Sequence, residues 1–118
     1  MRTMQMTNNE AYDALNLLVR LREKGRLGFV IAKNIRILRD EISEYISLRD
    51  KLIQEVGTKK DDAYVIDTPE NIRKFMDMIK EYDSISFEFT PQQIDEDTFC
   101  SGGLTSDQMY ALDWMVKE

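Results

Sequence analysis

The sequence predicts a mainly helical α+β fold, and two observations support this prediction. Apolar residues recur at helical spacing over several stretches, the longest of which, residues 29–56, contains no glycine or proline. Three short stretches, residues 2–6, 63–66 and 84–89, instead show alternation or a β-favouring composition. The expected order is β-α-α-β-α-β-α, with a long antiparallel helical hairpin beside a small sheet of two or three strands.

Length and composition predict one folded unit. A chain of 118 residues is the size of a single domain, so we expect residues 1–118 to share one core. Hydrophobic residues make up 42% of the chain and charged residues 32%, which is typical of a folded domain with a heavily charged surface.

The N-terminal part predicts a strand followed by a helix. Residues 2–6 alternate polar and apolar side chains, with the apolar ones on one side. Thr7 can then cap a helix over residues 8–24 while Glu10 reaches back to the cap nitrogen. Gly25 stands where the left-handed residue that ends a helix is expected.

The long apolar stretch predicts an unbroken second helix from Phe29 to Val56, antiparallel to the first. Its apolar positions alternate at spacings of 4 and 3, which is a heptad seam with one charged interruption. The seam, our candidate interface, consists of Ile35, Leu38, Ile42, Tyr45, Arg49, Leu52 and Val56. A helix of this length would span about 40 Å, more than the roughly 35 Å diameter expected of a compact chain this size.

Two alternatives follow for the second half of this helix. It packs on the remaining elements of the same chain, or it associates with another copy. Arg49 likewise has two interpretations: a long stem along apolar surface with its charged head in water, or a polar residue that sets the register of a dimer.

The second half of the chain predicts shorter elements. Residues 58–62 are expected to form a polar loop before the strand at 63–66. Thr68 and Pro69 mark the start of a third helix, and the strand at 84–89 follows it. If the two strands were parallel neighbours, the crossover between them would be right-handed.

The C-terminal part predicts an acidic loop and a last helix. Asp95, Glu96 and Asp97 suggest the loop, which lacks the ligand spacing and glycine of a calcium-binding EF-hand. Thr105 and Gln108 form the signature of a capping box at the start of the last helix.

Charge is distributed unevenly along the chain. Residues 1–60 contain 12 Lys or Arg and 8 Asp or Glu, whereas residues 61–118 contain 4 and 14, which makes the whole chain −6. Either the acidic half folds back on the basic one, or the basic residues bind nucleic acid or another partner. The candidate nucleic-acid residues are Arg20, Arg22, Lys24 and Arg26. An extended acidic face could also occupy a basic cleft on a partner.

Residues for catalysis are scarce. The chain has no histidine, so the commonest general base and metal ligand are missing. Cys100 is the only cysteine; with no base or cation nearby, we expect a buried or half-buried thiol rather than a nucleophile. No phosphate-binding or dinucleotide glycine motif is present. We therefore expect no enzyme activity, no cofactor, no metal site and no small-molecule substrate.

The sequence also predicts the cellular compartment of the protein. No run of about 18 apolar residues suggests a membrane span, and the first residues lack the apolar core of a signal peptide. A lone cysteine excludes an internal disulfide and suits a reducing compartment. The expectation is the cytoplasm of the host cell, with virion association as a further option.

The order of several segments resembles a known family. These segments are "TNNEAYDALNLL", "IAKNIRILRDEISEYISLRDKLIQEVG", "VIDTPENIRKFMDMI", "SISFEF" and "LTSDQMYALDWMV". They resemble small proteins of unknown function encoded by phages and prophages of Gram-positive bacteria. The resemblance implies a viral accessory protein and no site residues. The expected function is non-enzymatic protein–protein interaction, with a homo-oligomer among the options; the alternative is a nucleic-acid-binding accessory protein.

Overall fold

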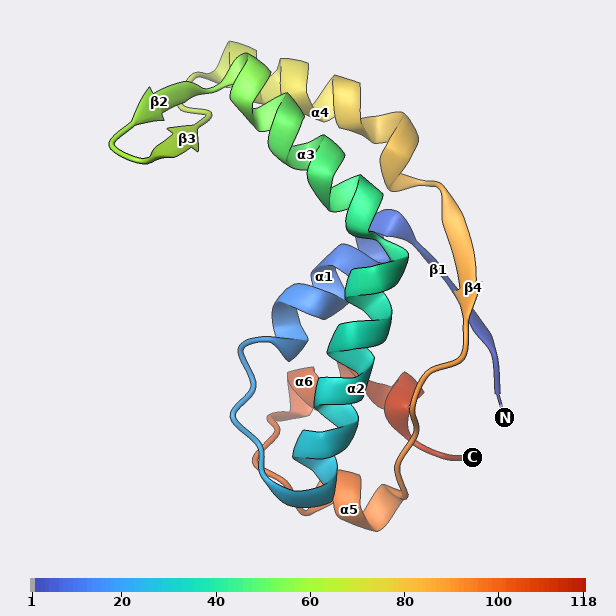
Figure 1. Cartoon of the computed structure of the whole chain (residues 1–118). Coiled ribbons are helices and arrows are strands. Elements are labelled where there is room, and N and C mark those ends of the chain that lie inside the picture. Colours follow the sequence, from blue (N-terminus) through green and yellow to red (C-terminus); the bar gives the residue numbers. More distant parts are fainter. Residues whose placement is uncertain (1) are drawn as a thin grey trace.

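The computed structural model describes residues 2–118 and has an α+β fold with an elongated outline (Figure 1). Its radius of gyration is 16.5 Å and its extents are 47 × 29 × 22 Å. A compact chain of this length would have a radius of gyration of about 13–14 Å. The excess arises because the chain forms a body, residues 2–42 and 84–118, and an arm, residues 43–83.

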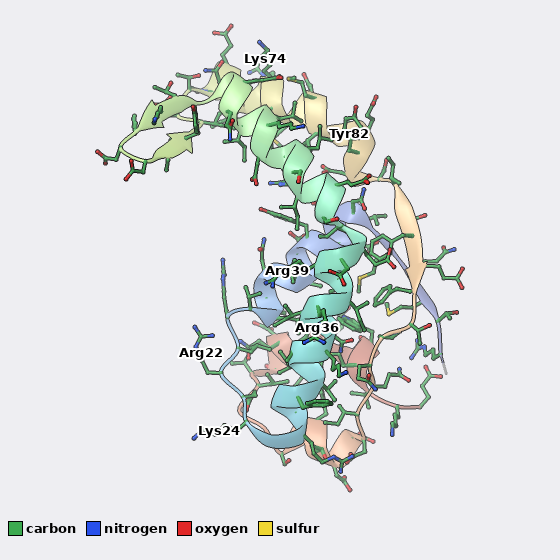
Figure 2. All side chains as sticks on the ribbon, viewed as in Figure 1. Arg22, Lys24, Arg36, Arg39, Lys74 and Tyr82 are labelled. Carbon is green, nitrogen blue, oxygen red and sulfur yellow. The ribbon has the colours of Figure 1, made fainter. Side chains whose placement is uncertain are left out.

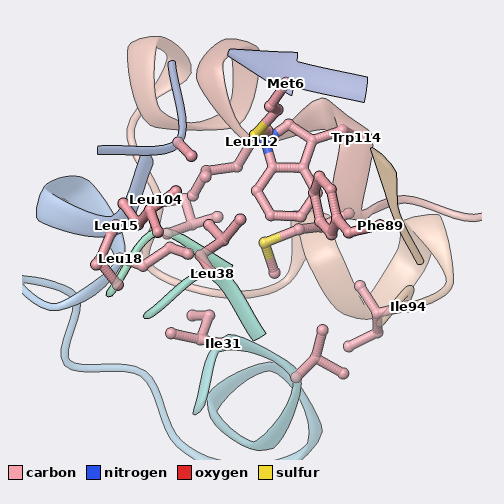
Figure 3. Packing of buried hydrophobic residues seen from close by; sticks show 14 of the residues in the cluster. Met6, Leu15, Leu18, Ile31, Leu38, Phe89, Ile94, Leu104, Leu112 and Trp114 are labelled. Carbon is pink, nitrogen blue, oxygen red and sulfur yellow. The ribbon is translucent and has the colours of Figure 1, made fainter. Parts of the chain in front are cut away.

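The body contains most of the elements. In chain order these are β1 (Met4–Thr7), α1 (Asn8–Leu18), α2 (Gly25–Glu41), β4 (Ser86–Phe89), α5 (Glu96–Cys100), α6 (Ser106–Ala111) and the 3₁₀ helix η1 (Asp113–Met115). β1 and β4 pair antiparallel, with Met6 opposite Phe87. α2 lies between α1 and the C-terminal elements, and side chains from all of them meet in one core (Figure 3).

One buried polar residue fastens α2 to the segment after β4. Asn34 is fully buried and donates from Nδ2 to the Gln92 carbonyl oxygen at 2.9 Å. The Gln92 backbone N–H donates to Asn34 Oδ1 at 2.8 Å. The Asn34 side-chain amide therefore both donates to and accepts from the Gln92 backbone, so its polar groups are satisfied inside the core.

The arm is a pair of helices with a small hairpin at the far end. Its elements are α3 (Ser43–Val56), β2 (Thr58–Lys60), β3 (Ala63–Val65) and α4 (Pro69–Asp83). Figure 1 shows α3 and α4 side by side, running in opposite directions. The Thr68 hydroxyl accepts from the Asn71 N–H and Pro69 opens α4, so the predicted start of this helix is confirmed.

The prediction of one unbroken helix from Phe29 to Val56 is wrong. The helix bends at Ile42, whose φ and ψ of −109° and 20° separate α2 from α3. The next residue, Ser43, donates from its hydroxyl to the Asp40 carbonyl at 3.3 Å, a bond of the kind that competes with helix geometry. The bend leaves Ile42 only 1% exposed and turns α3 toward α4.

The first helix is shorter than predicted, so the expected long hairpin is only partly present. α1 ends at Leu18, and α1 packs against α2 but α3 packs mainly against α4. Gly25 has the expected positive φ, 64°, yet it is the first residue of α2 rather than the end of α1. Residues 19–20 form a turn and residues 21–24 a loop, which the Glu23 carboxylate joins to the loop after α5 by accepting from the Gly103 N–H at 2.5 Å.

The β elements also differ from the expected order. The predicted polar loop contains β2, which pairs with β3 as a hairpin, and Asp61 at its turn has a positive φ of 56°. β3 and β4 do not pair, so there is no crossover; β4 pairs with β1 instead. Near the C-terminus, Asp95 caps α5 where a loop was predicted. Both predicted capping boxes, at Thr7 and at Thr105, are confirmed.

Candidate interaction surfaces

The structure places the predicted heptad seam inside the chain. Leu38, Ile42, Tyr45, Leu52 and Val56 are buried, and Ile35 and Arg49 are half-buried. The body covers the first half of the seam and α4 covers most of the second. These residues can reach a second copy only through their half-buried members or if this packing opens, so their role in self-association stays a prediction.

Arg49, the charged interruption of the seam, is held among aromatic rings. Its guanidinium carbon lies 4.2 Å from the centre of the Tyr12 ring and 5.4 Å from that of Phe75. Its Nη1 also donates to the Tyr45 hydroxyl at 3.2 Å. The cation therefore joins α1, α3 and α4 at the base of the arm through cation–π contacts, rather than extending its head into water.

The Tyr45 hydroxyl completes this junction by donating to the Asp83 carboxylate. Burial and this hydrogen bond raise the pKa of Tyr45 to about 12, although neighbouring Arg49 acts in the opposite direction. The hydroxyl is thus a firm donor at neutral pH. The arrangement ties the first turn of α3 to the last turn of α4 and is structural in character.

The predicted nucleic-acid residues lie at the surface of the body. Arg20, Arg22, Lys24 and Arg26 are all exposed, on residues 19–24 and the first turn of α2. Arg22 donates to the Val19 carbonyl at 3.1 Å, and Arg26 forms an ion pair with Asp95 at 3.3 Å. Figure 2 shows Arg22 and Lys24 projecting from this segment. The four cations are brought together, but one of them is already neutralised.

A second basic surface lies on the solvent side of α2. Lys33, Arg36 and Arg39 follow Phe29 there, and the Phe29 side chain is 62% exposed. Lys33 Nζ lies 5.4 Å from the centre of the Phe29 ring. These three cations belong to the basic half of the chain, residues 1–60, but the aromatic residue beside them was not singled out from the sequence. The signal was present, because Phe29 lies opposite Leu27 and Ile31 on a helical wheel.

The arm exposes apolar side chains on its β2–β3 hairpin and on α4. Every residue of β2 and β3 is exposed, and Tyr64 and Val65 are 42% and 40% exposed. On α4, Ile72 and Met76 are 43% and 60% exposed. Ile72 and Met76 share helical spacing with the half-buried Phe75 and the buried Ile79, yet both remain exposed.

An open groove of about 780 Å³ lies along β1 and the C-terminal residues. Five acidic and two basic side chains line it: Glu10, Asp13, Glu96, Asp113, Glu118, Arg2 and Lys117. Arg2 and Glu118 form an ion pair at 2.9 Å. Among its lining residues, all within the described chain, none is Ser, Thr, Cys, Tyr or His. The groove presents net negative charge and has no hydroxyl, thiol or imidazole side chain among the described residues that line it.

Other chemical groups are dispersed. Within residues 2–118, no three His, Cys, Asp or Glu side chains are grouped so that they could hold a metal ion. Cys100 is exposed at the end of α5, so the prediction of a buried or half-buried thiol is wrong. The short helix points Phe99 into the core, which leaves its neighbour toward solvent.

Among the helices in residues 2–118, none is both long and apolar enough to cross a lipid bilayer.

Comparison with known proteins gives no relative for this arrangement. No protein-family model, curated protein or solved structure matches the chain.

Proposed function

We propose that this chain is a non-enzymatic phage or prophage accessory protein that acts by protein–protein interaction, and that the tip of its arm binds a second copy of the chain. One observation carries the proposal. The arm ends in a two-stranded hairpin, residues 58–65, whose six strand residues are all exposed.

Such a hairpin is incomplete as a sheet. Its two outer edges have unpaired backbone groups, which are a template for another strand, and an isolated two-stranded hairpin is marginally stable in water. Pairing the hairpins of two copies would create four strands and cover part of Tyr64 and Val65. A two-fold arrangement uses the same edge of both hairpins, so this contact is complete with two copies.

Charge favours contact at the tip over contact elsewhere. The chain carries −6 in total, so two copies repel each other at long range. The hairpin contains Lys59, Lys60, Asp61 and Asp62, and its net charge is zero. Lys59 and Lys60 lie on β2 and the two aspartates in the turn, so antiparallel copies that are offset along β2 can bring the lysines of one toward the turn of the other.

The phage or prophage assignment rests on the sequence resemblance. It is tested by the genes beside the coding sequence: a position among tail or lysis genes supports a virion role, and one among early genes supports interference with the host. A position in a metabolic operon of the bacterium would contradict the assignment.

Self-association is tested by light scattering coupled to size-exclusion chromatography, from low to high micromolar concentration. We expect the mass to rise toward twice that of one chain. Tyr64→Lys, at the hairpin, should remain a monomer throughout the series. Tyr110→Lys is the matched control, because Tyr110 is 85% exposed on α6 in the body, and it should associate like the unmodified chain. A strict monomer at high concentration, or equal association of both variants, would refute the proposal.

A further inference from the structure

The solvent face of α2 combines one aromatic ring with three cations. Phe29, Lys33, Arg36 and Arg39 are separated by 4, 3 and 3 residues, so they lie within one half of the helix surface. The opposite half is the core face, where Leu27 and Ile31 are buried. Figure 2 shows Arg36 and Arg39 on the near side of α2.

The exposure of Phe29 is not explained by the packing of the body. The ring is 62% exposed in a helix whose core face is fully covered. A single exposed apolar side chain needs no explanation on its own. The ring is unusual because a lysine Nζ stands 5.4 Å from its centre and two arginines follow on the same face.

The cations of this face are available to a ligand. No salt bridge in the described part of the chain involves Lys33, Arg36 or Arg39. Asp40 is the one acidic residue on the same face, and Glu23, the nearest acid in the preceding segment, is bound to the Gly103 N–H. A chain with a net charge of −6 therefore keeps a locally basic surface.

We propose that the solvent face of α2 binds single-stranded nucleic acid, with Phe29 stacking on a base while Lys33, Arg36 and Arg39 contact phosphates. Cationic side chains that follow the backbone, combined with an aromatic ring for the bases, are the usual means of binding a single strand. The face from Phe29 to Arg39 is ~15 Å long, so it contacts only a few nucleotides. Exposed Arg20, Arg22 and Lys24 extend the positive field beyond one end.

A single strand suits this face better than a duplex does. The faces of bases are free to stack on a side chain only where the bases are unpaired. On a duplex, Phe29 would find no stacking surface and only the cations would contribute. The site lies on the body, so it is independent of the arm and of the self-association proposed above.

The test is fluorescence anisotropy of a labelled oligothymidylate with the full chain in low salt. We expect binding that Phe29→Ala weakens by about 5- to 100-fold, the effect of losing one stacked base. The triple variant Lys33→Ala, Arg36→Ala, Arg39→Ala should lower the slope of log K against log salt by about 2, because each lost phosphate contact contributes about 0.7.

Two controls keep the test specific. Tyr110→Ala removes an exposed ring of the body, and the triple variant Arg73→Ala, Lys74→Ala, Lys80→Ala removes exposed cations of α4; both should bind like the unmodified chain. Lys33 is half-buried and the other substituted positions are exposed. Circular dichroism verifies that each variant is folded. No binding in low salt would overturn the proposal. So would equal affinity for a duplex of the same length with no effect of Phe29→Ala, which indicates attraction to any polyanion.

Discussion

The body and the arm bury their apolar residues to different extents. The body has several side chains with no measurable exposure, namely Ala11, Leu18, Leu38, Leu112 and Met115. The best-buried apolar residues of the arm keep a little exposure, from 3% at Ile79 to 7% at Leu52. In the body, α1, the β1–β4 pair and the C-terminal elements share one core with α2, whereas the arm is two helices in contact along one side.

This difference indicates which part of the molecule can unfold locally. Two helices cover only one stripe of each other, so more of the arm's backbone hydrogen bonds stay near water. Much of the arm's attachment lies at its base, where Arg49, Tyr45 and Asp83 meet. We expect the arm to open locally at lower free energy than the body unfolds.

The largest expected effect is a difference in the stability lost when a leucine is truncated in the core of the body or in that of the arm. Leu38→Ala removes a fully buried side chain in the body and should lower the free energy of unfolding by about 2–5 kcal/mol. Leu52→Ala, in the arm, should cost less because its surroundings can collapse into the space. Urea unfolding of both variants measures the difference. Equal costs would mean that the arm is packed as firmly as the body.

The next effect concerns the base of the arm. Tyr45→Phe removes the hydroxyl shared by Asp83 and Arg49 and leaves both half-buried groups without that partner. We expect a loss of about 1–3 kcal/mol, measured by urea unfolding at neutral pH. Tyr110→Phe, at an exposed position, is the control and should change nothing. A neutral result for Tyr45→Phe would show that the junction does not hold the arm.

The same hydroxyl predicts a pH dependence. The pKa of Tyr45 is about 12 in the folded chain, above the value of 10.0 expected when unfolded. The folded state therefore keeps a proton that the unfolded state loses, and the stabilisation present below pH 10 declines as pH rises toward 12. The free energy of unfolding of the unmodified chain should fall more steeply with pH in this window than that of Tyr45→Phe. The same pH dependence in both proteins would contradict the raised pKa of Tyr45.

Helix caps allow the same chemical change to be made in each region. Thr7 caps α1 in the body and Thr68 caps α4 in the arm. Replacing either with Ala should cost about 1 kcal/mol. If the arm opens by itself, Thr68→Ala should speed amide exchange in α4 and leave α2 unchanged, whereas Thr7→Ala should speed exchange in both. Uniform acceleration by Thr68→Ala would show a single cooperative unit.

The smallest effect is expected at the tip of the arm. Lys60 and Asp67 form an ion pair at 2.9 Å, which lowers the pKa of Asp67. Because both side chains are largely open to solvent, Asp67→Asn should leave the midpoint of urea unfolding unchanged within error. A clear destabilisation would mean that the hairpin contributes to the fold as well as to contacts.

Local features were predictable where neighbours in the chain decide them. The capping boxes at Thr7 and Thr105, and the start of α4 at Thr68, depend on residues three positions apart. The α+β class was also predictable, because helical and alternating periods differ clearly. The bend at Ile42 was not, since its one local sign is the hydroxyl of Ser43.

The candidate surfaces were predicted less well. The seam pattern is the same for a core and for an interface, and only the position of α4 shows that most of its members are covered. Arg49 interrupts the seam for a reason that lies in Tyr12 and Phe75, 37 and 26 residues away in the chain. The strand β3 of the exposed hairpin was predicted, but β2 was predicted as part of a loop because Lys59 to Asp62 has no apolar alternation.

Sequence alone predicts where α1, α4 and α6 begin and which residues are apolar on these helices, and it shows that the chain has no histidine and an uneven charge. Three features follow only from contacts in the folded chain: β1 pairs with β4, α3 turns away at Ile42 to pack on α4, and Phe29 remains in solvent. The two groups of features differ in the sequence separation of the interactions that set them. Caps and periodicity act over three or four residues, whereas strand pairing, helix bending and exposure are set by contacts between segments tens of residues apart.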